Sequence, residues 1–192
     1  MPAKGVQIDD LSVSVICEPG PDTELLAREV QRTRARVTRI WPMPPRLPDD
    51  HDILVCDYTE SLTDALPWSP GEAGSALIVV LPACGIYNYE LLTSCSPDAV
   101  LHRPFRPHMV KTSLMIARNQ FLYFKRLQMR IARLDETLRA ARDIERAKHI
   151  IMQSRSVSES EAYECLRRSA MDRRVTIATM ATAIIDSQVV LR

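Results

Sequence analysis

The chain has 192 residues, of which 46% are hydrophobic and 26% charged, a composition typical of a folded globular protein and not of a disordered one. The net charge of +1 hides an uneven distribution, because residues 1–105 hold 8 Lys and Arg against 15 Asp and Glu, whereas residues 106–192 hold 17 against 9. The second half therefore has the charge of a domain that binds a polyanion, unless the two halves are domains with unrelated surfaces.

Two further absences narrow the class of protein. No apolar run approaches the ~18 residues of a membrane-spanning helix, and the first residues lack the apolar core of a signal peptide, so we expect a cytoplasmic protein. The cysteines form no C-x-x-C pair and the four histidines form no cluster, which predicts reduced thiols and no metal or other cofactor. No nucleophile motif such as G-x-S-x-G occurs, so nothing points to an enzyme. The five cysteines are Cys17, Cys56, Cys84, Cys95 and Cys165.

Short β-type segments alternate with helical or irregular segments in the first half. Residues 11–17 are rich in β-branched side chains, and Asp22 is a candidate N-cap for a helix over residues 23–33. The stretch 59–73 contains two prolines and has weak periodicity, so we expect this crossover to be poorly formed. The strands that we expect after the first are residues 37–41, 53–56, 76–81 and 99–102. Near-continuous apolar strands separated by crossovers indicate a doubly wound parallel sheet of five strands.

Everything after residue 107 has helical character, without Gly or Pro. Apolar side chains recur at alternating spacings of three and four, which is the a/d pattern of a coiled coil. A helix with this stripe would expose it to water, so we expect burial against a second copy; the alternative is packing against the same chain. The members of the predicted dimer seam are Phe124, Leu127, Ile131, Leu134 and Leu138.

The last segment has the pattern of a three-helix bundle. Ser158 and Glu161 match a capping box, which marks the start of a helix, and Thr176 opens another. With residues 144–153 as the first helix, the apolar stripes suffice for a small core. We therefore predict an α/β plus all-α protein in three parts: a receiver-like domain (1–106), a dimerising coiled-coil helix (107–143) and a helical bundle (144–192).

Polar residues follow the ends of the predicted strands, where doubly wound sheets place their reactive groups. The positions read Glu18, Asp57, Pro82 and Arg103. This arrangement resembles the receiver domain of bacterial response regulators, in which an acidic pair and a phosphate-accepting Asp hold Mg²⁺. The resemblance implies that Asp57 is the acceptor, but Cys17 replaces one carboxylate of the pair.

Two other receiver positions also depart from the pattern. Pro82 stands where the switch Ser or Thr belongs, and Arg103 replaces the usual Lys. Without the second carboxylate the ion site is weakened, and without the hydroxyl the domain cannot report a phosphate. We therefore expect a degenerate receiver that phosphorylation does not control. A working receiver that uses Asp57, and a purely structural role for Asp57 at its strand end, are the alternatives.

The C-terminal segment resembles the ANTAR domain, a three-helix module of transcription antiterminators. Apolar and basic positions match in order over about 45 residues, with two departures, His149 and Ser156, at positions where Gly is customary. The matching residues include Ala147, Lys148, Ser158, Glu161, Ala162, Leu166, Arg167, Arg168, Ala170, Met180 and Ala181. Together with a degenerate receiver and a coiled coil, the chain resembles AmiR-type regulators. The resemblance implies a pair of ANTAR domains that bind nascent RNA, and a separate ligand-sensing protein that holds the regulator inactive.

Basic residues crowd the predicted bundle, and guanidinium groups suit the phosphates and unpaired bases of RNA hairpin loops. The net charge of residues 144–192 is only +2, so these side chains could also form an ordinary solvated face. The candidate RNA-binding residues are Lys148, Arg155, Arg167, Arg168, Arg173 and Arg174. DNA reading by residues 176–187 is disfavoured, because that helix carries no Arg or Lys.

These patterns predict a dimeric, non-enzymatic regulator that binds hairpins in nascent leader RNA and prevents transcription termination. A phosphorylation-dependent two-component response regulator that uses Asp57 is the first alternative. A scaffold that binds only protein is the second.

Overall fold

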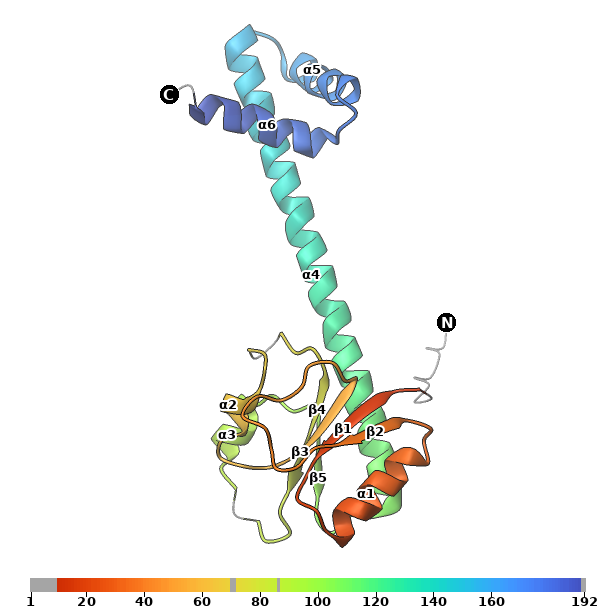
Figure 1. Cartoon of the computed structure of the whole chain (residues 1–192). Helices are drawn as coiled ribbons and strands as arrows, with labels where there is room; N and C mark the ends of the chain where they lie inside the picture. Colours follow the sequence, from red (N-terminus) through yellow and green to blue (C-terminus); the bar gives the residue numbers. More distant parts are fainter. Residues whose placement is uncertain (1–9, 70–71, 86, 191–192) are drawn as a thin grey trace. The chain divides into compact units, whose positions relative to one another are not determined.

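The computed structural model describes residues 10–69, 72–85 and 87–190 (Figure 1). The chain forms two compact units, with the boundary between Lys125 and Arg126. The first unit contains the strands β1 (Ser12–Ile16), β2 (Arg36–Arg39), β3 (Ile53–Asp57), β4 (Ala76–Leu81) and β5 (Ala99–His102), and the helices α1 (Pro21–Gln31), α2 (Leu62–Ala65) and α3 (Tyr89–Ser94). Helix α4 (Pro107–Arg155) begins in this unit and continues into the second, which also contains α5 (Glu159–Asp172) and α6 (Ile177–Val190).

The five strands form one parallel sheet in the order β2-β1-β3-β4-β5. This is the doubly wound order in which the crossover connections cover both faces of the sheet. The residues of β4 are all buried, and those of β3 are buried up to Asp57, as expected for strands covered on both sides. The predicted five-stranded, receiver-like sheet is confirmed, together with the long helix and the C-terminal helices.

Each face of the sheet has its own hydrophobic core. On one face, the strands pack against α1, through Leu26 and Val30, and against the start of α4, through Val110 and Leu114. On the other face, α2 and α3 contribute Leu62 and Leu92 to a second, separate cluster. Figure 1 shows this arrangement, with α1 and α4 on one side of the sheet and α2 and α3 on the other.

The start of α1 and the crossover after β3 can be compared with the predictions. Both lie in the first unit, which we call the sheet unit. Asp22 does not cap α1: the helix begins at Pro21 behind Gly20, and no side chain caps it. Proline is well suited to this first helical position because its missing N–H would have no partner there, so the helix starts two residues earlier than predicted. In the described part of the crossover after β3, the only helix is the four-residue α2, as expected for a stretch with weak helical periodicity.

An ion pair fastens the start of α4 to the sheet. Arg118 Nη2 lies 2.8 Å from Asp52 Oδ1, while Asp52 Oδ2 accepts hydrogen bonds from the backbone N–H and the hydroxyl of Ser12 at 2.9 and 3.0 Å. Burial opposes the charged form of Asp52, but the hydrogen bonds from Ser12 and the charge of Arg118 outweigh it and lower the pKa of the carboxyl. The position of α4 on the sheet unit is therefore held by a charged group as well as by apolar packing.

The second unit, which we call the helical unit, has a core that contains several alanines. Ala147, Ala162, Ala170 and Ala181 are buried around Leu166, which is fully buried. The predicted capping box is confirmed: the Ser158 hydroxyl accepts from the Glu161 N–H, and the Glu161 carboxylate accepts from the Ser158 N–H at 2.9 Å. Alanine faces let the helices approach closely, and Leu166 fills the space between them together with Ile151 and Met180.

The turn between α4 and α5 explains the customary glycine at position 156. Ser156 has a φ of 53°, in the left-handed region that glycine adopts without steric cost. The serine therefore strains this turn. Within the described ranges, no helix combines the length and the hydropathy needed to cross a membrane.

Candidate nucleic-acid interface and receiver-like site

The candidate phosphoacceptor Asp57 ends β3, and both of its carboxylate oxygens are occupied by groups of this chain. Oδ1 lies 2.7 Å from Nη2 of Arg103, and Oδ2 accepts the backbone N–H of Glu18 at 2.7 Å. The guanidinium of Arg103 also lies 3.9 Å from Asp22 and 5.2 Å above the ring of Phe105. Asp57, at the end of β3, thus connects two other segments. Its carboxylate accepts a hydrogen bond from the residues after β1 and pairs with Arg103 after β5.

The residues around Asp57 do not fit the Mg²⁺ site of a working receiver. Glu18 donates its backbone N–H to Asp57, while its side chain is exposed and forms no ion pair with another described residue. Burial raises the pKa of the Cys17 thiol, and the charge of Asp57 raises it further, so the thiol is neutral at physiological pH. Mg²⁺ prefers several oxygen ligands, and here one carboxylate already pairs with a guanidinium. Among the described residues, no three metal-ligating side chains gather in one place.

Pro82 directly follows β4, as predicted, and is half-buried. It has no hydroxyl that could bind a phosphoryl group. We expect that acetyl phosphate and Mg²⁺ leave no stable label on the purified protein, because Arg103 neutralises Asp57 and nothing replaces the missing ligands. Phosphate-affinity electrophoresis measures the phosphorylated fraction. A receiver domain that has the complete set of phosphorylation residues is the positive control. A label on the wild-type chain that disappears in Asp57→Ala would contradict the expectation.

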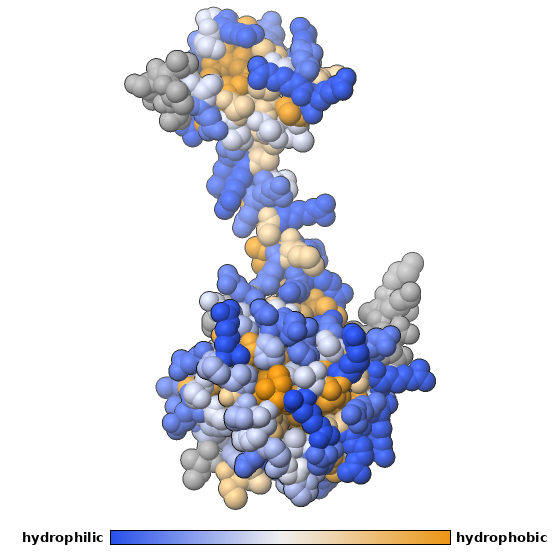
Figure 2. All heavy atoms as spheres, in the orientation of Figure 1, coloured by the Kyte–Doolittle hydropathy of each residue, from blue (hydrophilic) through white to orange (hydrophobic). Residues whose placement is uncertain are grey.

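The predicted seam residues lie on α4 and are exposed in the single chain. Phe124, Ile131, Leu134 and Leu138 are each more than half exposed, with Leu134 the most exposed at 63%, while Leu127 is half-buried. Figure 2 shows apolar side chains at the surface among charged ones along this helix. Phe124, Ile131 and Leu138 follow one another at intervals of seven residues, and exposed apolar side chains of this size are unfavourable in water.

The structure separates the six candidate RNA-binding residues into two groups. Lys148 does not fit the predicted role, because its side chain is buried and its Nζ pairs with Glu145 at 2.8 Å and with Glu159 at 2.6 Å. Hydrogen bonds to the carboxylates of Glu145 and Glu159 raise its pKa. Arg155, at the end of α4, donates to the sulfur of Cys165 at 3.1 Å. Lys148 therefore joins α4 to the start of α5, and Arg155 contacts the middle of α5.

The remaining arginines lie together on the second half of α5 and the turn after it. Arg167 is exposed, 3.4 Å from Glu164, a weak pair. Arg168, Arg173 and Arg174 are exposed as well and form no ion pair with any other described residue. Arg174 has a φ of 56°, in the left-handed region, and lies in the turn that joins α5 to α6. These four exposed arginines lie within eight positions of the chain, and we call them the α5 arginine patch.

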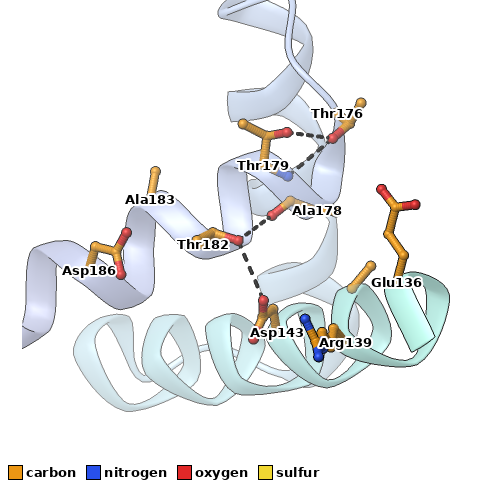
Figure 3. Close-up of a pocket in the computed structure, with 10 residues that line it drawn as sticks. Glu136, Arg139, Asp143, Thr176, Ala178, Thr179, Thr182, Ala183 and Asp186 are labelled. Carbon is orange, nitrogen blue, oxygen red and sulfur yellow. Dashed lines mark hydrogen bonds between the residues drawn. The ribbon is translucent and has the colours of Figure 1, made fainter. Parts of the chain in front are cut away.

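The sequence did not reveal a groove that lies between α4 and α6. It has a volume of about 550 Å³ and is open to solvent (Figure 3). The single hydroxyl hydrogen of Thr182 is shared between the Ala178 carbonyl at 3.1 Å and Asp143 Oδ2 at 3.5 Å. The polar residues that line the groove include Glu136, Arg139 and Asp143 from α4, and Thr179, Thr182 and Asp186 from α6. The only sequence signal was the spacing of three between threonines 176, 179 and 182.

A receiver-like sheet with a closed acceptor site, followed by a helical unit with a capping box and a basic patch, defines a regulator built on the response-regulator plan. A family model described as "AmiR, N-terminal" matches residues 11–118, and a second, described as "ANTAR domain", matches residues 132–185. The first model alone covers more than half of this chain. The chain therefore belongs to the AmiR family, with an ANTAR domain at its C-terminal side. The predicted resemblance is confirmed.

Two relatives match most of the chain. It is 22% identical to the aliphatic amidase regulator of Pseudomonas aeruginosa over 93% of each chain. It is 28% identical to the transcriptional regulatory protein PdtaR of Mycobacterium tuberculosis over 71% of this chain and 68% of that protein. Among solved structures, the response regulator StyR matches 92% of this chain and 98% of its own, with 11% identity and a TM-score of 0.49. The matched relatives are regulators and not enzymes.

Proposed function

We propose that this chain is a transcription antitermination regulator that acts as a dimer on hairpins of nascent leader RNA. The observation that carries the proposal is the α5 arginine patch within the ANTAR domain, where Arg168, Arg173 and Arg174 are exposed and unpaired with other described residues. Unpaired guanidinium groups bind phosphates at two points and stack on unpaired bases. The relatives' names, which describe an amidase regulator and a transcriptional regulator, support a role in gene expression.

We propose the three functional parts as 1–106, 107–143 and 144–192, the middle part being the coiled coil of the dimer. With Phe124 at heptad position a, Arg130 falls at g and Asp135 at e. In a parallel pair of helices, each g residue faces the e residue five positions later in the partner, so Arg130 would meet Asp135 of the second copy. Neither side chain has an ion-pair partner among the described residues of its own chain. Their charges therefore favour a second copy in parallel orientation as the occupant of the seam.

The control of this dimer follows from the closed site at Asp57. A carboxylate that is already paired with Arg103 at 2.7 Å has no free charge for Mg²⁺ or a phosphoryl group. We therefore propose that a ligand-sensing protein partner, and not phosphorylation, controls the regulator in the cytoplasm. The phosphorylation-dependent alternative gains no support from the arrangement of these side chains.

Filter binding with full-length protein tests the proposed function. Hairpins from the leader transcripts of neighbouring genes are expected to bind, with affinity that falls as salt rises because phosphate contacts release counterions. Arg168→Ala/Arg174→Ala is expected to lose at least ~10-fold in affinity and to show a smaller salt slope. The matched control is Arg28→Ala/Arg36→Ala, which removes two exposed arginines from the sheet unit. Equal affinity of the wild type for unrelated RNA would defeat the proposal.

A further inference from the structure

Helix α4 carries a second group of basic side chains, separate from the α5 arginine patch. Arg139, Arg142 and Arg146 follow one another at intervals of three and four residues. His149 comes three residues later, at a position where Gly is customary in the ANTAR domain. All four side chains are exposed, and this spacing places them on one side of a helix with 3.6 residues per turn. We call these four residues the α4 basic row.

The α4 basic row faces away from the core of the helical unit. On α4, the side chains of Ala147, Lys148 and Ile151 are buried in this unit. At 3.6 residues per turn, these buried positions lie on the opposite side of the helix from the row. The row is therefore part of the outer surface of the folded unit.

The proposed dimer would leave the row uncovered as well. In the heptad that starts at Phe124, Arg139 and Arg146 fall at position b, which points away from the partner helix. Arg142 falls at position e, where a parallel second copy would present Thr137 from its position g. Threonine carries no charge, so the second copy does not neutralise this arginine.

The acidic residues within the span of the row are engaged elsewhere. Glu145 pairs with Lys148 at 2.8 Å, and Asp143 accepts a hydrogen bond from Thr182 at 3.5 Å. None of the three arginines of the row forms an ion pair with another described residue. Like charges three or four residues apart repel one another and destabilise a helix. A polyanion that lies along the row would remove this repulsion.

The charge of the basic half of the chain is also concentrated on α4. Residues 106–143 hold 9 Lys and Arg against 3 Asp and Glu, whereas residues 144–192 hold 8 against 6. The affinity of a protein for RNA grows with the number of phosphates that its cations neutralise. The α5 arginine patch by itself therefore accounts for only a part of the binding that the charge of this half allows.

We propose that the α4 basic row binds the phosphate backbone of the paired stem of an RNA hairpin. The inference rests on the proposed function and extends it from the unpaired loop to the stem. The row repeats cations at regular intervals along roughly 15 Å of one helix. The phosphates of a paired strand are regularly spaced, whereas those of a loop are not, so the stem matches the row better.

Contacts of this kind hold and orient the RNA without reading its sequence. A guanidinium group binds a phosphate through two N–H donors, and phosphate contacts fix the register of a protein on a duplex. The imidazole of His149 adds a hydrogen-bond donor at the end of the row, which the customary glycine lacks. The stem contact is therefore expected to be stronger in this chain than in a variant that lacks the His149 side chain.

Filter binding with full-length protein and three versions of one leader hairpin tests the inference. The first version is unmodified, the second has uncharged methylphosphonate linkages in the stem, and the third has the same number of them in the loop. The wild type is expected to bind the stem-modified hairpin about 10-fold more weakly than the unmodified one. Arg139→Gln/Arg146→Gln is expected to bind the unmodified hairpin about 10-fold more weakly than the wild type, with a salt slope smaller by about 2. This variant should lose no further affinity when the stem is modified.

Two other variants complete the experiment. Arg28→Gln/Arg36→Gln removes the same charge from exposed positions of the sheet unit and is expected to bind all three hairpins as the wild type does. His149→Ala is expected to weaken binding of the unmodified hairpin about 3-fold, the size of one hydrogen bond, and to leave binding of the stem-modified hairpin unchanged. Thermal melting and sedimentation check that each variant keeps the fold and the oligomeric state of the wild type.

Three results would overturn the inference. If the Arg139/Arg146 variant loses as much affinity on stem modification as the wild type does, the row does not touch the stem, while the proposed RNA binding stands. If the effect of this variant disappears with the loop-modified hairpin instead, the row binds the loop. If the wild type binds the leader hairpin no better than unrelated RNA, the proposed function fails and the inference fails with it.

Discussion

The variant Leu134→Asp/Leu138→Asp is expected to be monomeric at concentrations where the wild-type chain is a dimer. Both leucines are more than half exposed in the single chain, so their substitution leaves the fold of one copy intact. Burial of each leucine in the seam contributes about 1.5–3 kcal/mol, and two copies contribute four such side chains. We expect the dimer dissociation constant to rise at least ~100-fold, as measured by sedimentation over a concentration series.

A matched control separates the seam from general surface hydrophobicity. Met129 is as exposed as Leu134, at 63%, but lies at heptad position f, away from the seam. Met129→Asp is expected to remain dimeric, whereas Leu134→Asp alone weakens the dimer. The monomeric variant is also expected to bind paired hairpins more weakly, because two linked modules bind with a higher effective concentration. A wild-type chain that sediments as a monomer at tens of micromolar would contradict the dimer.

The variant Leu166→Ala is expected to unfold the helical unit and to leave the sheet unit folded. Leu166 is fully buried, and its neighbours Ala147, Ala162, Ala170 and Ala181 are too small to fill the cavity it would leave. A Leu→Ala change in such a core costs about 2–5 kcal/mol, a large part of the stability of a unit of this size. RNA affinity should fall with the loss of this unit.

Circular dichroism during thermal unfolding measures the effect of Leu166→Ala. The transition that belongs to the helices is expected to move to lower temperature, while the β-sheet transition stays in place. Leu166→Met, which nearly keeps the volume, is expected to cost much less. A single transition that shifts as a whole in Leu166→Ala would contradict the independence of the two units.

The elements of this protein could be predicted because their signals are local. The strand segments are short apolar runs, the capping box needs only Ser158 and Glu161, and the seam repeats every seven residues along one helix. The helix over 23–33 was placed two residues late, because Asp22 is a good capping residue but Pro21 fits the first turn better. Local propensities compete at helix ends, so boundaries are less certain than the elements themselves.

The charged side chains were harder to assign. Composition placed Lys148 among the candidate RNA ligands, but the start of α5 brings Glu159 to within 2.6 Å of it. A basic residue looks the same in a sequence whether it meets solvent or a carboxylate. The partner is decided by the packing of one helix against another.

The sequence by itself therefore determined the succession of strands and helices along the chain and the family, while the dimer seam stays a prediction. The tertiary structure alone decided that Arg103 closes the site of Asp57, 46 residues earlier in the chain, and that α4 and α6 enclose a groove. The physical reason is distance along the chain: periodic burial is written in neighbouring residues, whereas an ion pair or a groove exists only after remote segments have packed together.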